Sequence, residues 1–242
     1  MTTVTTSARP VAERVEALDW DKLREELDNR GFAVTDQVLG GAECSDLAAL
    51  FDDGRFRSTI DMARHRFGEG RYRYFDHPLP ELIAELRGSF YSRLAPIANA
   101  WSELLGSGDE FPPRHEELLE RCSSAGQERP TPLILRYGKG DWNALHQDLY
   151  GDVYFPFQVL TVLSEPFVDY EGGEFVLVEQ RPRAQSRAHV ITPPRGAFVI
   201  FPTQQRPQRG KRGYHRVGMR HGVSAVTCGQ RTALGVIFHD AR

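Results

Sequence analysis

His146 and Asp148, two positions apart in NALHQDLYGD, are residues of this chain whose types and spacing can hold a metal ion. A β-strand places residues i and i+2 on the same face, so both side chains can point into one cavity. An imidazole and a carboxylate are two of the three ligands of the facial triad that holds non-haem Fe(II) and leaves positions open for other molecules. The alternative is a capped polar turn that binds no metal.

A third ligand is available much later, in RHGVSAVTCGQRTALGVIF. His221 stands at the head of a strand-like run there, and Arg231 follows beyond an expected turn at Gly229. A histidine on one strand and an arginine on the next can face the same interior, where a guanidinium grips a carboxylate through two hydrogen bonds. Two alternatives remain: His215 as the third ligand, although no strand-turn-arginine pattern follows it, and a buried structural ion pair for Arg231.

The elements that must position these residues follow Pro130 as short runs rich in Val, Ile, Leu and Phe, separated by Gly, Pro and Asp. Several strands at this spacing predict a sandwich or barrel rather than alternating βαβ units. These runs are TPLILRYGKGD, FPFQVLTVLSEP, GGEFVLVEQ, AHVITP, GAFVIFP and RTALGVIF.

The part of the chain before Pro130 is mainly helical in pattern, with one short strand, FAVTDQVL. Its strongest helical segment, PELIAELRGSFYSRLAPIANAWSELLG, is expected to bend or break near Pro96. We therefore predict a mainly β protein with α support. Residues 1–12 form a disordered tail, and 13–242 form a single domain in which helices of 13–129 pack outside a β core formed by 130–242.

Composition restricts the classes of function. The 242 residues are 40% hydrophobic and 26% charged, which is ordinary for a soluble globular protein. No apolar run approaches the roughly 20 residues of a membrane span, and MTTVTTSARP has no apolar core of a secretory signal. Three widely separated cysteines predict a reducing, cytoplasmic setting. A net charge of −3 gives no global basic footprint for nucleic acid.

The order of the motifs HxD, GGEF, GAFVIF and HxVxxVxxGxR resembles the Fe(II)- and 2-oxoglutarate-dependent dioxygenases of the prolyl-4-hydroxylase type. The resemblance covers residues from about 131 to 240, and the order of the motifs is more specific than any one of them. It implies a double-stranded β-helix, or jelly roll. The last motif consists here of His221, Val223, Val226, Gly229 and Arg231.

The same resemblance implies roles for individual residues. His146, Asp148 and His221 correspond to the three iron ligands, and Arg231 to the arginine that grips the distal carboxylate of 2-oxoglutarate. Tyr137 stands where a tyrosine of these enzymes often hydrogen-bonds the co-substrate, although it fits a core aromatic equally well. The implied cofactor is Fe(II), with 2-oxoglutarate and O2 as co-substrates and succinate and CO2 as products.

A closer resemblance extends over almost the whole chain. It is to a bacterial family of 2-oxoglutarate oxygenases whose usual label is oxidative demethylation of damaged DNA, a reaction in which a hydroxylated N-methyl group leaves as formaldehyde. Similarity of this kind does not settle the substrate, so a nucleic acid, a small molecule and a protein side chain all remain open. The stretches that carry it are RYRYFDHPLPELIAELR, AGQERPTPLILRYGKGDWNALHQDLYGD, GGEFVLVEQRPRAQSR and MRHGVSAVTCGQRTALGVIFHDA.

Three arginine-rich stretches are candidates for the substrate. EQRPRAQSR brings Arg181 and Arg183, and with Tyr150 these are the predicted substrate contacts. QQRPQRGKRGYHRVGMRH is a basic loop just before His221 that can hold phosphates. GRFRSTIDMARHRFGEGRYRYF interleaves arginines with aromatics that can stack bases. Solvated loops with local ion pairs are the alternative for all three.

A function of another class also fits part of the pattern. A jelly roll with a metal site can be a cupin-like binding module that never turns over a substrate. Arg231 discriminates between the two, because a simple metal binder has no need of a buried grip for a dicarboxylate.

Overall fold

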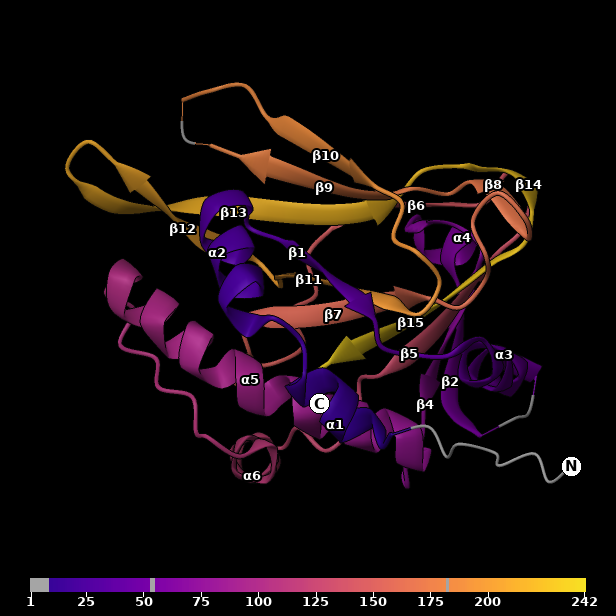
Figure 1. The fold of residues 1–242 in the computed structure, drawn as a ribbon, viewed down its shortest axis with the longest axis horizontal. Helices are drawn as coiled ribbons and strands as arrows, with labels where there is room; N and C mark the ends of the chain where they lie inside the picture. Colours follow the sequence, from indigo (N-terminus) through magenta and orange to yellow (C-terminus); the bar gives the residue numbers. More distant parts are fainter. Residues whose placement is uncertain (1–8, 53–54, 182) are drawn as a thin grey trace, which may run out of the picture.

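A seven-stranded antiparallel sheet is the larger of the two main sheets in the computed structural model, which describes residues 9–52, 55–181 and 183–242. Its central strand, β15, comes from the C-terminal end of the chain and lies between β7 and β5 (Figure 1). In spatial order its strands are β1 (Ala33–Gln37), β11 (Ala197–Pro202), β7 (Phe157–Val162), β15 (Arg231–Ile237), β5 (Leu133–Tyr137), β4 (Arg71–Phe75) and β2 (Phe56–Asp61).

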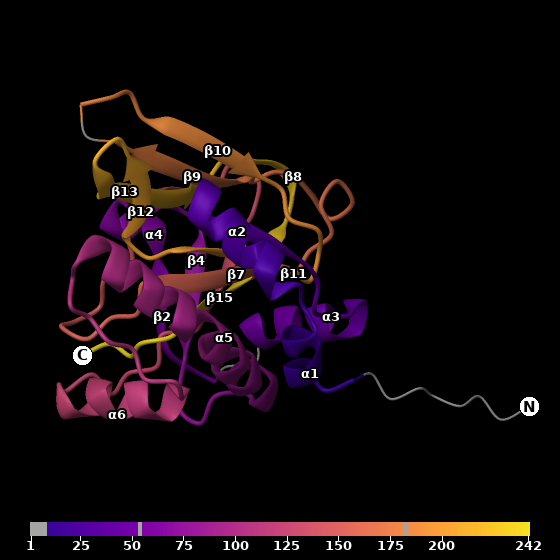
Figure 2. The same ribbon diagram turned by 60° about the vertical axis from the view of Figure 1, so that its left-hand side comes forward.

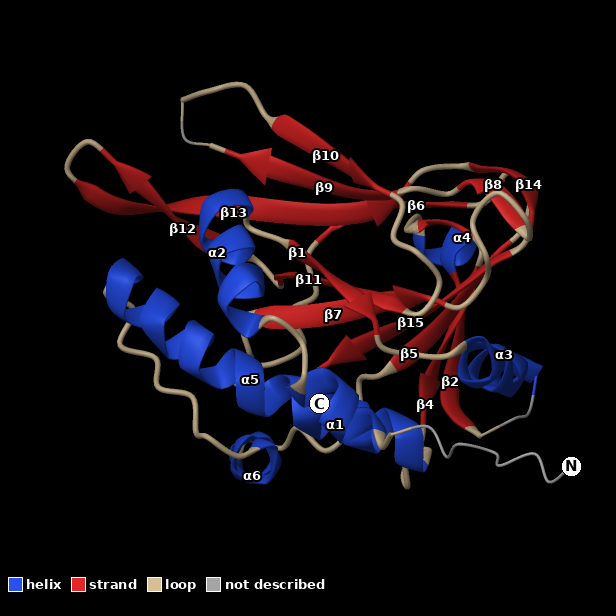
Figure 3. Ribbon diagram, viewed as in Figure 1, coloured by secondary structure: helices blue, strands red, loops and turns tan. Residues whose placement is uncertain are grey.

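A smaller antiparallel sheet covers the inner face of the large sheet (Figure 3). Its long central strand, β13, pairs with three others, and a separate two-stranded ribbon of β8 (Tyr170–Gly172) and β14 (Val226–Gly229) lies at one end. The strands of the small sheet are β10 (Arg187–Ile191), β9 (Phe175–Gln180), β13 (Gly213–Val223), β6 (Trp142–His146) and β3 (Gly68–Glu69), with β12 (Gln205–Gly210) paired to β13. The predicted jelly roll is confirmed.

The strands β11, β7 and β15 of the large sheet are buried on both faces, which explains their nearly uninterrupted apolar sequences. Along β15, Ala233 and Ile237 face the space between the sheets, whereas Leu234 and Val236 belong to the layer packed under the helices. The helical layer contains α1 (Val11–Glu16), α2 (Trp20–Arg30), α3 (Gly41–Ala49), the 3-10 turn η1 (Leu50–Asp52), α5 (Glu81–Leu105) and α6 (His115–Ser124), and α4 (Met62–His65) lies beside the small sheet (Figure 2).

The long helix α5 packs across the outer face of the large sheet, where the Trp101 and Phe157 rings lie 4.5 Å apart. Pro96 does not break it, because α5 runs continuously from Glu81 to Leu105. Buried side chains before and after the proline, Leu94 and Ile97 among them, hold both halves on the core. None of the described helices is long and apolar enough to span a membrane.

Three sequence expectations about organisation need adjustment. Besides its helices and the predicted strand that becomes β1, the region 13–129 supplies β2, β3 and β4, which join both sheets. The stretch before His221 is not a loop, because it forms the hairpin β12–β13. Residues 1–8 of the predicted tail lie outside the described residues, and the buried Val11 begins α1. Alternating arginines concealed β4, since Tyr72 and Tyr74 alternate with Arg71 and Arg73 along it.

Candidate metal centre and its cavity

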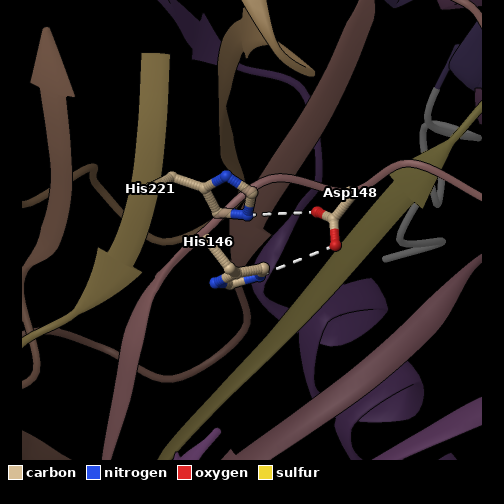
Figure 4. A group of neighbouring side chains, drawn as sticks. All are labelled: His146, Asp148 and His221. Carbon is tan, nitrogen blue, oxygen red and sulfur yellow. Dashed lines mark ion pairs between the residues drawn. The ribbon is translucent and has the colours of Figure 1, made fainter. Parts of the chain in front are cut away.

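Three side chains that could hold a metal ion converge on the inner face of the small sheet. His146 ends β6 and pairs in register with His221 of the neighbouring β13, while Asp148 follows in the loop after β6. Asp148 Oδ2 lies 3.1 Å from His221 Nε2, and Oδ1 lies 3.6 Å from His146 Nε2 (Figure 4). One ligand atom from each residue lies within 4.8 Å of the other two. Two imidazoles and one carboxylate are the donor set of the facial triad.

Hydrogen bonding and charge prepare these groups for a cation. His146 Nδ1 lies 2.7 Å from the carbonyl oxygen of Ala144, which can only accept, so Nδ1 carries the proton and Nε2 is free to bind metal. Burial and the neighbouring His221 lower the pKa of His146. Burial alone would raise the pKa of Asp148, but His221, His146 and a hydrogen bond from Tyr150 bring it well below its usual range. The site therefore offers an ionised carboxylate beside a neutral imidazole.

Tyr150 lies behind the three candidate metal-binding residues and hydrogen-bonds to one of them, Asp148. Its hydroxyl donates to Asp148 Oδ1 at 2.6 Å, and the hydroxyl of Tyr74 donates to Tyr150 at 3.1 Å. Burial and the Asp148 charge raise the pKa of Tyr150 well above its usual value, so the hydroxyl remains a donor. The sequence predicted Tyr150 as a substrate contact; the structure places it in the cavity wall with its hydroxyl on Asp148, a candidate metal ligand. Residues that orient ligands in this way fix the geometry of a metal site.

Arg231 is the first residue of β15 and is only 1% exposed. Among the described residues its three guanidinium nitrogens have no hydrogen-bond partner of normal geometry, and no carboxylate forms a salt bridge with it. The structural ion pair considered as an alternative is therefore absent from the described residues. A buried cation without a partner is costly, so this position calls for an anion.

Tyr137 lies directly across from Arg231 on β5, with the guanidinium carbon 5.6 Å from the centre of its ring. Its hydroxyl accepts a hydrogen bond from Asn143 Nδ2 at 3.3 Å. Burial raises the pKa of Tyr137 to about 12 against the opposing effect of Arg231, so the hydroxyl keeps its proton and can still donate. Both polar groups face the same cavity as the metal ligands.

That cavity lies between the two sheets and has a volume of about 370 Å³. Its deep wall combines apolar side chains with a few polar groups, which is the usual character of a small-molecule site. At the mouth stand Arg66 and Phe67, two exposed residues of the turn between α4 and β3. Further lining residues are Tyr72, Tyr74, Leu133, Leu135, Gln158, Leu160, Phe175 and Phe201.

Several predicted or competing residues do not reach the cavity. Neither Arg181 nor Arg183 lines it, and Arg181 forms a 2.9 Å salt bridge with Glu179. His215 lies at the far end of β13, exposed and paired with Gln208 of β12. On position, His221 rather than His215 is the metal-ligand candidate.

Sequence reasoning did not single out Gln158, which lies inside the apolar run of β7. This side chain is buried, lines the cavity and leaves its Nε2 without a partner among the described residues. A sequence feature that could have identified Gln158 is that it places a polar residue within the apolar run FQVLTV. Arg66, Phe67, Tyr72 and Tyr74 come from the stretch proposed to stack bases, and the structure places part of that stretch at the cavity.

The fold is that of the jelly-roll oxygenases of the prolyl-4-hydroxylase type. A Pseudomonas putida prolyl-4-hydroxylase superposes with a TM-score of 0.52 at 16% identity over 92% of this chain and 99% of that one. An oxidoreductase of the 2OG-Fe(II) oxygenase family from Burkholderia pseudomallei gives 0.53 at 17% identity over 92% of each chain. A Trichoplax adhaerens prolyl hydroxylase, solved with a peptide of the hypoxia inducible factor, superposes with a TM-score of 0.54 at 15% identity over 98% of this chain and 94% of that one.

Residues 70–241 match the model of the Oxygenase-NA family, described as "Oxygenase, catalysing oxidative methylation of damaged DNA". The chain belongs to this family, and the prediction of an oxygenase is confirmed. Uncharacterized proteins from two strains of Mycobacterium tuberculosis are each 49% identical over 189 residues, which is 78% of this chain and 78% of theirs.

Proposed function

We propose that this oxygenase uses Fe(II), 2-oxoglutarate and O2 to hydroxylate a C–H bond, and that its substrate is an N-methylated base of damaged DNA. The observation that carries the proposal is the meeting, in one cavity, of the two-histidine-one-carboxylate cluster and an unpaired, buried arginine. The cluster alone would also suit a simple metal binder, and the arginine alone would suit any small anion. Together they fit a metal ion and a dicarboxylic acid.

The donor set fits Fe(II) because three ligands on one side leave the opposite positions for a ketoacid and oxygen. The three protein groups are two histidine Nε2 atoms and the Asp148 carboxylate. Iron bound with 2-oxoglutarate supplies the oxidising chemistry: one oxygen atom of O2 enters succinate as CO2 is lost, and the other enters the substrate C–H bond.

Arg231 and Tyr137 suit the distal end of 2-oxoglutarate. The guanidinium can take both carboxylate oxygens through parallel hydrogen bonds, and the protonated Tyr137 hydroxyl has a proton to donate. The surrounding apolar walls exclude water and strengthen these contacts. Tyr150 holds Asp148 through Oδ1, while Oδ2 faces His221 Nε2.

The substrate proposal rests on the family description and on the mouth of the cavity, where an arginine and an aromatic ring stand together. Hydroxylation of an N-methyl group leaves an N–CH2OH group, which breaks at the C–N bond to give formaldehyde and the base with its N–H restored. A methyl group is thus removed without cleaving the base from its sugar.

The test supplies single-stranded DNA containing 1-methyladenine to the enzyme with Fe(II), 2-oxoglutarate and O2, and measures succinate and formaldehyde. Equal amounts of the two products, absent with unmethylated DNA or with Asp148→Ala, are expected. Succinate without formaldehyde would overturn the demethylase proposal and point to a small molecule or protein side chain. A folded protein that binds metal but not 2-oxoglutarate would overturn the oxygenase mechanism and leave a cupin-like metal binder.

A further inference from the structure

We infer that Arg66 and Phe67 form the clamp that holds a single-stranded nucleotide at the mouth of the cavity, with Phe67 stacked on a base and Arg66 paired with a neighbouring phosphate. The inference rests on the proposed function and adds which part of the chain recognises the substrate. Both residues line the cavity, and they come from the turn between α4 and β3 (Figure 1).

Backbone hydrogen bonds fix this turn against the strand that carries a metal ligand. The Phe67 carbonyl accepts from the Ala144 amide at 2.8 Å, and Gly68 pairs with Asn143 across β3 and β6. Ala144 lies on β6 just before His146. A ligand held by the turn is therefore positioned relative to the metal by one rigid strand, without an intervening loop.

Gly68 makes this close docking possible. Its φ is +131°, and a Cβ added there would lie 2.2 Å from the carbonyl oxygen of Trp142. Only glycine has both the conformation and the absence of a side chain that the approach requires. The residues just before Gly68 are thereby brought to the wall of the cavity.

Arg66 occupies a backbone conformation that does not favour arginine. Its φ is 59°, in the left-handed region where glycine and asparagine are preferred. Its guanidinium is exposed at the cavity and forms no salt bridge with any described carboxylate. An exposed cation beside the cavity, without a described carboxylate partner, fits an anionic group of the substrate.

Phe67 is 47% exposed, unusually high for a phenylalanine, and its ring stacks on His65 with centroids 5.4 Å apart and planes within 20°. The stack fixes the ring as a flat platform of the kind on which nucleic acid-binding proteins stack bases. Exposed Leu145 on β6 also lines the cavity and extends its apolar rim.

A stacking ring next to an unpaired cation matches the alternation of base and phosphate along a single strand. A base within a duplex cannot reach a recessed metal, so the target must be single-stranded or turned out of the helix. A peptide would use the rim without needing the cation.

The experiment measures binding of a fluorescently labelled single-stranded oligonucleotide containing 1-methyladenine by anisotropy, anaerobically, with Fe(II) and 2-oxoglutarate bound. Arg66→Asn removes the charge but keeps a residue that tolerates the left-handed backbone, and Phe67→Ala removes the platform. Arg212→Gln, at the exposed tip of the β12–β13 hairpin, is the matched control. The visible band of the iron–ketoacid complex verifies that every variant retains its site.

Phe67→Ala is expected to weaken binding about tenfold or more. Arg66→Asn is expected to weaken it and to reduce the slope of log affinity against log salt by about one, because one phosphate contact is lost. Arg212→Gln should bind as wild type does. Equal binding by all three variants and wild type would overturn the clamp but leave the proposed function intact. A wild-type protein that shows the band but binds no oligonucleotide would overturn the nucleic acid substrate together with the clamp.

Discussion

Two arginine-rich segments, 64–73 and 206–220, look alike in sequence but occupy very different places. The first includes the turn after α4, which stands at the cavity mouth. The second forms the hairpin β12–β13, whose tip projects at the other end of the long axis in Figure 1. Even within the second segment, Arg206 is buried on Glu179 at 3.0 Å. The arginine content of a segment therefore does not predict whether the segment lies at the cavity. Strand pairing does, because the register of a strand determines which of its residues face the cavity.

The largest contrast is expected between two histidines of the same strand, β13. His221→Ala removes a proposed metal ligand and should weaken binding of Mn(II), a redox-stable substitute for iron, by more than about 100-fold, beyond the 10–100-fold typical of outer-sphere residues. His215→Ala, at the exposed hairpin end, should bind Mn(II) as wild type does. Calorimetric titration measures the Mn(II) affinity of both variants. An equal loss of affinity in the two would contradict the assignment of His221 as the third ligand.

Arg231→Met should have opposite effects on the free and the bound protein. Without ligand, it removes an unpaired buried charge, so the melting temperature should be unchanged or higher. With metal and 2-oxoglutarate, the wild type should gain stability that the variant lacks, because affinity falls by roughly 100-fold when one partner of a buried charge pair is lost. Arg216→Met, exposed on the hairpin, is the control. Thermal melting that shows a destabilised free variant would contradict the unpaired state of Arg231.

Tyr150→Phe tests the hydrogen bond that orients Asp148, a proposed metal ligand. Loss of the 2.6 Å hydrogen bond to Asp148 should lower Mn(II) affinity about tenfold while leaving the fold intact. Tyr214→Phe, on the hairpin, removes the same atom from an exposed tyrosine and should change nothing. If the two variants bind metal equally well, Tyr150 only contacts the substrate, as the sequence suggested.

The smallest effect is expected at the hairpin tip. Replacing Arg209, Lys211 and Arg212 together by glutamine changes only exposed charges. Oligonucleotide affinity should shift by no more than about 0.5 kcal/mol, roughly twofold. A loss comparable with that of Arg66→Asn, measured by the same anisotropy assay, would show that the hairpin shares in binding and would remove the contrast between the segments.

The features that the sequence predicts best are those coded by short, local patterns. The apolar run of β15 and the HxD pair are of this kind. The family resemblance added the expected roles of His221 and Arg231. Three features needed the structure. Arginines hid the alternation of Tyr72 and Tyr74, Gly68 docks on a strand distant in sequence, and the direction of Tyr150 depends on a loop. The docking of Gly68 depends on register between strands distant in the chain, and the direction of Tyr150 depends on the path of the loop after β6; composition and spacing encode neither.

Anaerobic titration of the metal-free protein with Fe(II) and 2-oxoglutarate tests the central claim most directly, since it asks whether one cavity holds both. The proposal predicts a visible charge-transfer band of the chelated ketoacid that saturates at one Fe(II) per chain. The band should vanish in His221→Ala and need far more 2-oxoglutarate in Arg231→Met. A folded wild-type protein that takes up Fe(II) yet gives no band at any 2-oxoglutarate concentration would contradict it.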